Sequence, residues 1–249
     1  MNNSEKGSPS DELIYSLLEH YQNGRLSNAE KLAVEITRDF PKHEFAWKVL
    51  GVIFEATDRK SESLNANQTA VKLSPQDAEA HNNLGNTLKE LGRLDEAEAS
   101  YNQALVLMPN YAEAHCNLGI ALHGLVRLEE AEASYNQAIV LKPDFPEAHS
   151  NLGITLQELG RLEEAEKSFN HALALRPDYA EAHSNLGNML KELGRLEDAE
   201  ASYNRALALE PNLAEAHNNL GTTLQGLGRL GEAETSLKKA IALSPQDAE

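Results

Sequence analysis

Apolar and polar residues follow a helical period along most of the chain. In residues 78–111, apolar or small residues recur three and four positions apart in two runs, separated by Gly92. That spacing places each run on one face of a helix. Glycine is favoured where a helix ends in a left-handed residue, and Pro109 cannot continue the second run. The pattern predicts two helices joined by a tight turn. The runs are Leu84, Gly85, Leu88 and Leu91, then Leu94, Ala97, Tyr101, Ala104 and Leu105.

The two-helix pattern repeats every 34 residues, as the step from Pro75 to Pro109 shows. A fixed period of this length predicts stacked supersecondary units and therefore an all-α solenoid. We number each unit so that Ala78 is position 1. Residues 1–9 are then expected to be a disordered segment, and residues 248–249 to open a truncated eighth unit, since "SPQDAE" at 244–249 also stands at 74–79. The seven predicted units are 10–43, 44–77, 78–111, 112–145, 146–179, 180–213 and 214–247, which together span 10–247.

Polar residues before the first helices resemble capping boxes. Asp144 stands three residues before Glu147 in "DFPEAH", and two other units repeat the form. In a capping box the side chains of the two residues satisfy backbone N–H groups at the helix start. The predicted pairs are Asp144–Glu147, Asn110–Glu113 and Asp178–Glu181.

These units resemble the tetratricopeptide repeat, a 34-residue helix–turn–helix family. The family has a large residue at position 4, Leu-Gly at 7–8, Ala at 20 and 27, an aromatic residue at 24 and Pro at 32. The resemblance implies a right-handed superhelix whose first helices line a concave groove. Unit 44–77 carries Trp47, Leu50, Gly51, Phe54, Ala70 and Pro75, and unit 78–111 carries Leu84, Gly85, Leu88, Ala97, Tyr101, Ala104 and Pro109.

Some positions depart from this family pattern. Leu17 stands where glycine is expected, Ser63 where alanine is expected, and Val126 where the turn glycine is expected. A β-branched residue tolerates a left-handed turn poorly, so we expect that turn to be strained or rebuilt, with Gly124 relieving it. Position 4 is histidine in the last five units: His81, His115, His149, His183 and His217.

Position 6 is asparagine in five successive units, while positions 5, 9 and 12 vary. It lies two residues from position 4, about 200° round the helix, and therefore points away from the core. A row of side-chain amides can bind the main chain of an extended peptide without reading its sequence. Copying between repeats, or hydrogen bonds between repeats, would also explain the row. The candidate peptide-binding residues are Asn83, Asn117, Asn151, Asn185 and Asn219, with Asn86, Asn188, Lys89 and Lys191 at neighbouring groove positions.

The upstream units lack this row, because position 6 is Tyr15 and then Val49, so that end of the groove should be more apolar. The asparagine row, with "ELGRLEEAE", is most similar to the repeat arm of O-GlcNAc transferase and related bacterial proteins. That resemblance implies an arm that recruits protein substrates to a separate catalytic domain. The chaperone-binding class of these repeats uses Lys at position 5, where the asparagine-bearing units hold Asn, Cys or Ser.

These patterns are consistent with three functions. We predict first a protein–protein interaction scaffold that binds an extended peptide. The alternatives are the substrate-recruiting arm of a larger glycosyltransferase-like enzyme, and a solenoid that self-associates through a C-terminal end left uncovered. That end carries Leu237, Ile241 and Leu243.

Several other features have structural explanations. The periodic histidines are too far apart to share a metal ion, because equivalent side chains of neighbouring units are about 10 Å apart. Cys116 is expected to be inert packing. First-turn glutamates suit a helix N-terminus. No catalytic or phosphate-binding motif appears, so we expect no enzyme activity, metal or cofactor in this chain. The first-turn glutamates are Glu79, Glu113, Glu147, Glu181 and Glu215.

The amino-acid composition limits which classes of partner the protein can bind. The formal net charge of −17 argues against nucleic acid and against an anionic membrane surface, and the 41% apolar fraction is enough for a core. The N-terminus lacks a basic start followed by an apolar run, and no run of eighteen apolar residues occurs. We therefore expect a cytoplasmic protein with protein or peptide partners.

Overall fold

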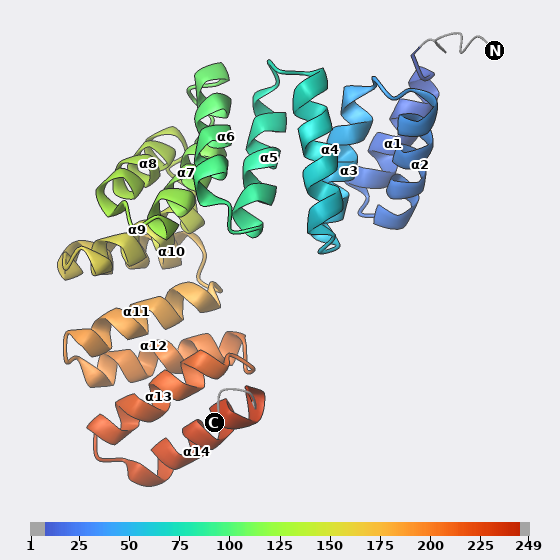
Figure 1. Ribbon diagram of the computed structural model, residues 1–249. Coiled ribbons are helices and arrows are strands. Elements are labelled where there is room, and N and C mark those ends of the chain that lie inside the picture. Colours follow the sequence, from blue (N-terminus) through green and yellow to red (C-terminus); the bar gives the residue numbers. More distant parts are fainter. Residues whose placement is uncertain (1–7, 245–249) are drawn as a thin grey trace. The chain divides into compact units, whose positions relative to one another are not determined.

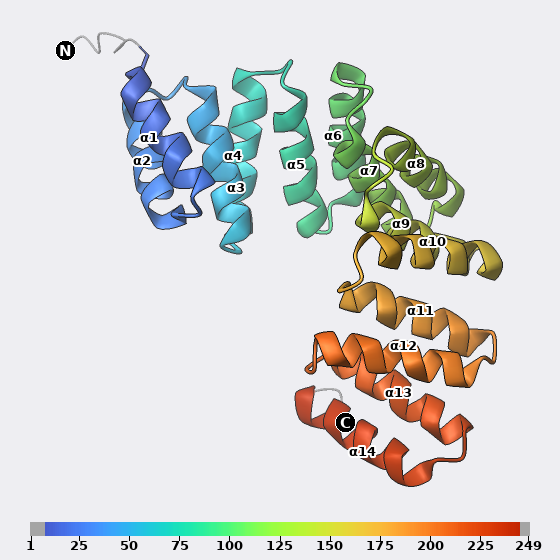
Figure 2. The same cartoon turned by 180° about the vertical axis from the view of Figure 1, so that it is seen from behind.

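The computed structural model describes residues 8–244 and contains helices but no strands in that range. The chain divides into two compact units, residues 1–126 (unit 1) and 127–249 (unit 2), which are described separately. Figure 1 and Figure 2 show successive helices lying side by side within each unit. Unit 1 holds α1 (Asp11–Gln22), α2 (Leu26–Asp39), α3 (Glu44–Ala56), α4 (Lys60–Leu73), α5 (Ala78–Glu90), α6 (Leu94–Leu107) and α7 (Ala112–Gly124). Unit 2 holds α8 (Leu128–Leu141), α9 (Pro146–Glu158), α10 (Leu162–Leu175), α11 (Ala180–Glu192), α12 (Leu196–Leu209), α13 (Ala214–Gly226) and α14 (Leu230–Leu243).

Within each unit, a first helix packs on the second helices that lie next to it in the chain. In unit 1, for example, α5 contacts both α6 and α4, and in unit 2 α13 contacts both α14 and α12. First helices of successive repeats also touch, as α9 and α11 do. This nearest-neighbour packing is that of a helical repeat solenoid, and the predicted all-α solenoid is confirmed.

In several repeats an aromatic ring from position 24 lies against the glycine at position 8. A Cβ added to Gly187 would sit 2.7 Å from the ring of Tyr203, and one added to Gly153 would sit 2.7 Å from Phe169. Both rings are fully buried. In these two repeats the glycine therefore makes room for the ring between the paired helices.

Position 15 adopts the left-handed conformation in the turn of each repeat where it is described. Glycine fills it at φ of 72–76° in Gly92, Gly160, Gly194 and Gly228. Val126 takes the same conformation at φ 60°, so the strained form of the turn occurs and the rebuilt form does not. Gly124 does not relieve it, because Gly124 is the last residue of α7 and packs on Leu94.

The predicted capping boxes are wrong. The first helices begin one residue later than the boxes require, after the N-cap residues Tyr111, Phe145 and Tyr179, and these make no side-chain capping bond. Of the first helices in the repeats from 78 onward, only α5 is capped by a side chain: Asp77 accepts hydrogen bonds from the N–H groups of Glu79 and Ala80. The physical reason is register, since the N-cap is position 34 and the boxes were placed on position 33.

Arginine at position 16 joins neighbouring repeats on their second helices. Arg161 donates to Glu132 of the preceding repeat at 2.6 Å and to Glu164 of its own. Arg195 and Arg229 repeat both bonds. Exposed ion pairs contribute little singly, about 0–1 kcal/mol each, but here one cation holds two helices at the same place in successive repeats.

Part of the sequence prediction falls outside the described residues. This applies to residues 1–7 of the expected disordered segment, to Pro245 and to residues 248–249 of the expected eighth unit. Ser8 and Pro9 precede α1, whose first turn Ser10 caps by accepting from the Leu13 N–H.

Candidate peptide-binding face

All nine predicted binding residues lie on first helices and are half-buried. We call positions 6, 9 and 12 of these helices the first-helix face. In unit 1 it includes Asn83, Asn86 and Lys89 on α5 and Asn117 on α7. In unit 2 it includes Asn151 on α9, Asn185, Asn188 and Lys191 on α11, and Asn219 on α13.

Two of the five position-6 asparagines bind neighbouring repeats of the same chain. The Asn117 amide donates to Oδ1 of Asn82 at 3.0 Å, and the Asn219 amide donates to Oδ1 of Asn188 at 2.9 Å. The Lys191 ammonium also donates to Oδ1 of Asn219 at 3.2 Å. Hydrogen bonding between repeats, the alternative explanation of the row, therefore accounts for these two.

The position-9 asparagines have a structural task. Asn86 accepts a hydrogen bond from the Tyr101 hydroxyl at 2.9 Å, and Asn188 accepts one from Tyr203 at 2.7 Å. A buried hydroxyl requires an acceptor. In repeat 146–179 the ring is Phe169, which has no hydroxyl, and position 9 is Ile154. The pairing of tyrosine with asparagine is not general, because repeat 112–145 combines Tyr135 with Ile120.

Three position-6 asparagines have uncommitted side chains. Among the residues that the structure describes, the amide groups of Asn83, Asn151 and Asn185 make no hydrogen bond. Each side chain is half-buried and offers a donor and an acceptor. These three are the amides that a ligand can use without displacing an internal partner.

Position 5 differs in burial along the chain. Asn82, Cys116 and Ser150 are nearly fully buried, whereas Ser184 is half-buried and Asn218 is exposed. Sequence reasoning also overlooked Lys48, which stands at position 5 of repeat 44–77. Its ammonium binds Asp77 at 3.0 Å and Glu79 at 2.5 Å. Burial opposes its charge, but the two carboxylates prevail and raise the pKa of Lys48.

The periodic histidines are structural, as expected, and the structure shows how. Nε2 of each lies 2.9–3.1 Å from the carbonyl oxygen of the proline six residues earlier. The carbonyl can only accept, so Nε2 carries the proton. Trp47 donates its indole N–H to the Pro41 carbonyl at 2.9 Å in the same way. Histidine thus replaces the large residue of the family because it supplies the same N–H.

A second asparagine row lies on the second helices. Position 25 is asparagine in four successive repeats, and all four side chains are exposed. The same residue at one position in successive repeats is therefore not evidence of binding by itself. Evidence for position 6 comes from the contacts of its side chains. The second row is Asn102, Asn136, Asn170 and Asn204.

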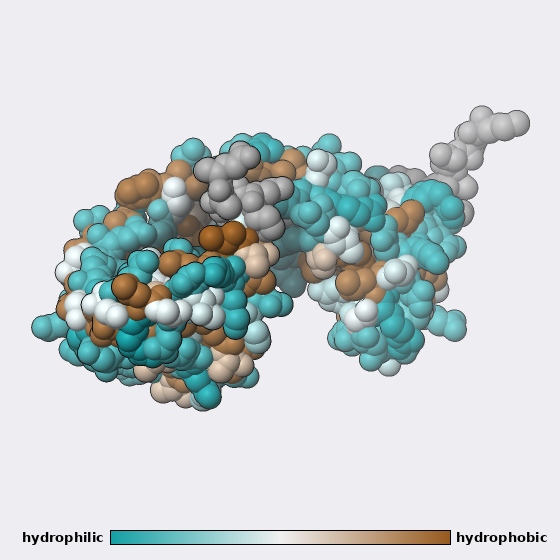
Figure 3. Space-filling model, turned by 90° about the horizontal axis from the view of Figure 1, so that it is seen from below, coloured by the Kyte–Doolittle hydropathy of each residue, from teal (hydrophilic) through white to brown (hydrophobic). Residues whose placement is uncertain are grey.

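Charged groups flank the first-helix face of unit 2. Burial opposes ionisation of Glu147, but its hydrogen bond from Arg176 prevails and lowers the pKa of the carboxyl. The Arg176 guanidinium also stacks on Tyr179, 4.6 Å from the ring centroid. On the surface shown in Figure 3, hydrophobic residues form small groups among hydrophilic ones.

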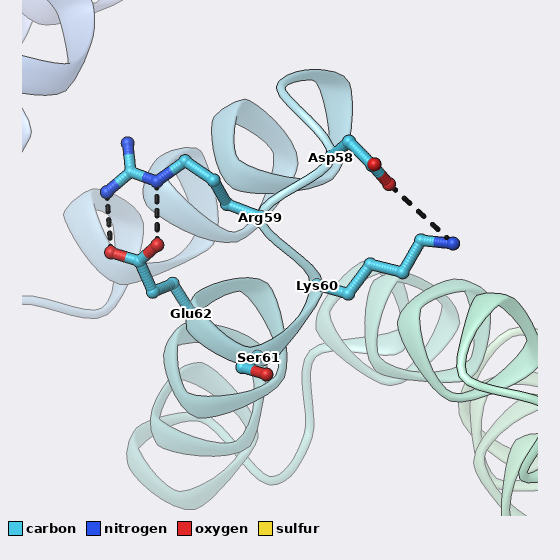
Figure 4. A pocket seen from close by; sticks show the side chains of 5 residues that line it. All are labelled: Asp58, Arg59, Lys60, Ser61 and Glu62. Atoms are coloured by element: carbon cyan, nitrogen blue, oxygen red, sulfur yellow. Dashed lines mark hydrogen bonds and ion pairs between the residues drawn. The ribbon is translucent and has the colours of Figure 1, made fainter.

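One surface pocket lies away from this face. It is lined by residues 58–62 at the start of α4, where Figure 4 shows Arg59 paired with Glu62 and Asp58 paired with Lys60. Because its charges already pair with each other, we assign it no ligand. The described residues contain no group of three or more His, Cys, Asp or Glu side chains that could hold a metal ion. None of the described helices has the length and apolar character needed to cross a lipid bilayer.

Solved structures of similar fold are tetratricopeptide repeat proteins and their assemblies. The chain superposes on a chain of the APC/C hetero-tetramer Cut9–Hcn1 with a TM-score of 0.83 and 20% identity, covering 96% of this chain but 47% of that one. It therefore spans about half the length of that match. A thermophilic TPR protein from Thermus thermophilus is 28% identical, with a TM-score of 0.64 and coverage of 73% and 99%. YrrB, described as a TPR protein with an unusual peptide-binding site, is 25% identical, with a TM-score of 0.56 and coverage of 73% and 93%.

Sequence models of this repeat match most of the chain, whereas no curated protein sequence matches it. The models are described as tetratricopeptide repeat or TPR repeat, and they match residues 17–78, 66–99, 85–126, 127–160, 144–210 and 178–246. Repeats of this family generally serve as protein-binding scaffolds rather than as catalysts. With its helix pairs, glycine-to-ring packing and 34-residue period, the chain belongs to the tetratricopeptide repeat family.

Proposed function

We propose that the first-helix face binds an extended protein segment through its uncommitted asparagine amides. The observation that carries the proposal is the contrast within the row. Asn117 and Asn219 are used internally, whereas Asn83, Asn151 and Asn185 are half-buried with no partner among the described residues. These amide groups remain open to a ligand, and a peptide main chain would supply both a donor and an acceptor for them.

Repeat geometry suits an extended ligand. Equivalent positions on successive first helices should be about 10 Å apart, from the usual distance between packed helices. Three residues of extended chain span about 10 Å. Asn151 and Asn185 can therefore bind one segment at main-chain groups three residues apart, and the side chains between them are left to determine specificity.

Neighbouring contacts hold the face in place. Asn188 accepts from both Tyr203 and Asn219, so α11, α12 and α13 are linked directly beside Asn185. Preorganised groups lose less entropy on binding. We propose that Asn86, Asn188, Lys89 and Lys191 act as supports and neighbours of the binding amides, with Asn83, Asn151 and Asn185 contacting the ligand.

The test compares the two asparagine rows. Peptides are selected from a random 15-residue display library on the wild-type protein, and their affinities are measured by titration calorimetry. Asn151→Ala with Asn185→Ala should weaken binding by roughly tenfold or more, because two hydrogen bonds are lost. The matched control is Asn170→Ala with Asn204→Ala, which removes two exposed amides from the second helices of the same repeats.

Equal losses in both double variants, or no loss in either, would reject the asparagine proposal. Helix content and melting temperature should stay nearly unchanged in both double variants, because neither removes a core contact. The two alternatives, a recruiting arm of a larger glycosyltransferase-like enzyme and a self-associating solenoid, stay predictions.

A further inference from the structure

The first-helix face of unit 1 differs at its N-terminal end. There α1 and α3 carry no position-6 asparagine. Instead they present Tyr15, which is 71% exposed, and the half-buried Leu18, Tyr21, Val52 and Glu55. We call these five residues the N-terminal face. It combines apolar and aromatic surface with a single carboxylate.

Glu55 is the unpaired carboxylate of this face. Its carboxylate is half-buried, and it makes no ion pair or hydrogen bond with any residue that the structure describes. Burial raises the pKa of the Glu55 carboxyl; nearby Lys89 opposes this, and Glu90 adds to it. Burial, and then the charges of Glu79 and Glu55, also raise the pKa of Tyr21. The negative charges of Glu55, Glu79 and Glu90 act on this face, and an added positive charge would be attracted to them.

Neighbouring carboxylates on α5 show how this surface is satisfied elsewhere. Glu79 binds the Lys48 ammonium at 2.5 Å, with Asp77 as its second acceptor. Glu90 lies 3.7 Å from the Lys89 ammonium and 3.9 Å from that of Lys60. In each case a lysine of the chain itself supplies the cation. Glu55 alone of the three glutamates makes no ion pair, although the charge of Lys89 acts on its carboxyl.

We infer that the N-terminal face docks a basic, extended protein segment and that Glu55 pairs with an arginine or lysine of that segment. This inference rests on the proposed function and gives the chemical class of its partner. The long side chain of either residue has an apolar stem that can lie on Tyr21 and Val52 while its charge reaches the carboxylate. The net charge of −17 draws such a segment towards the protein and repels acidic ones.

The experiment uses peptides chosen by binding to the wild-type protein, each made in two forms. One form keeps its arginine and lysine residues, and the other carries citrulline and norleucine in their place, so that shape is kept and charge is lost. Binding of both forms is measured to the wild type, to Glu55→Gln and to Glu35→Gln. Glu35 is an exposed carboxylate of α2 in the same unit, so both variants lose one negative charge.

The wild type should prefer the basic form by about fivefold or more, and Glu55→Gln should remove most of that preference while Glu35→Gln keeps it. The preference should shrink as salt rises. Equal binding of both peptide forms by the wild type would overturn the inference without touching the proposed function. A preference lost equally in both variants would also overturn it, because general attraction would then suffice. Failure of every peptide to bind would instead reject the proposed function, and this inference with it.

Discussion

Unit 1 and unit 2 use one repeat pattern with different strictness. In unit 2, Phe169, Tyr203 and, in the last repeat, Leu237 lie against the position-8 glycines, and all three described turns use glycine in the left-handed conformation. In unit 1, the ring of repeat 44–77 is replaced by Asn67, and two left-handed turn residues are Asp58 and Val126. The solenoid therefore forms without the usual aromatic residue and without the usual glycine.

The replacement of the ring has a specific solution. Asn67 is fully buried and donates to Thr87 at 2.9 Å and to Ser63 at 3.3 Å, while Ser63 binds both Thr87 and the Gly51 carbonyl at 2.9 Å. Oδ1 of Asn67 has no partner in the structure. Since Thr87 belongs to the next repeat, polar residues join two repeats here, where an apolar ring serves within a single repeat of unit 2. The polar joint depends on several hydrogen bonds, whereas the ring contact depends mainly on shape, with one hydroxyl bond at Tyr203.

The largest expected effect is in unit 2. Tyr203→Ala should lower the free energy of unfolding by about 3–5 kcal/mol, because a fully buried ring is removed and a cavity remains beside Gly187. Urea unfolding measures it, with exposed Asn204→Ala as the control. A loss below 1 kcal/mol would mean that ring packing is not what holds the repeat together.

A substitution in the polar joint of unit 1 should lower the free energy of unfolding by less. Asn67→Ala should cost about 1–3 kcal/mol, the usual range for removing one partner of a buried hydrogen-bonded group. Exposed Asn65→Ala on the same helix is the control. A cost equal to that of Tyr203→Ala would contradict the distinction between the two joints.

The turn that follows α7 should become more stable when Val126 is replaced by glycine. Val126→Gly should raise the free energy of unfolding by about 0.5–1 kcal/mol, because relief of the left-handed valine exceeds the added entropy of the unfolded glycine. Gly160→Val in unit 2 should lower stability by a similar amount. If both changes lower the melting temperature, strain at position 15 does not set turn stability.

The smallest effect concerns the stacked rings of His149 and His171, whose centroids are 5.5 Å apart. Burial lowers the pKa of His149 below its ordinary 6.5, the Pro143 carbonyl opposes this, and His171 adds to it. The neutral form is therefore favoured in the folded state. Its contribution to stability is present above pH 6.5 and is lost as pH falls through the lower folded pKa.

His171→Gln should consequently raise the pKa of His149 and weaken this loss, and an NMR titration of the imidazole measures the change. His183, whose pKa is lowered by burial and by Arg205 against the Pro177 carbonyl, is the internal control. An unchanged His149 titration would show that the stacked partner is electrostatically idle.

Periodicity predicted most of the fold, because repeat length and helix face are set by spacing that is visible in the letters. The turn at Gly92 and the helix end before Pro109 are confirmed for that reason. The capping boxes fail because a shift of one residue decides which side chain reaches a free N–H. The expectation that Gly124 relieves the turn is also wrong, because Gly124 is close to the turn in sequence but does not occupy the left-handed position.

The candidate site was predictable as a surface but not in its bonding. Helix periodicity correctly placed the asparagine row off the core. It could not reveal that the amides of Asn117 and Asn219 form hydrogen bonds with neighbouring repeats, because those bonds join residues 35 and 31 positions apart. Lys48 and Glu55 were missed for a related reason. Whether a charge is paired depends on which repeat lies beside it, and a single sequence does not show this.

The bond between each periodic histidine and its proline carbonyl gives the chain a set of natural spectroscopic reporters. While the joint is closed, the proton is fixed on Nε2; when the joint opens, the imidazole exchanges freely between tautomers. The imidazole nitrogen chemical shifts would then report local unfolding at five successive histidine–proline bonds of the wild-type protein. These histidines are His81, His115, His149, His183 and His217.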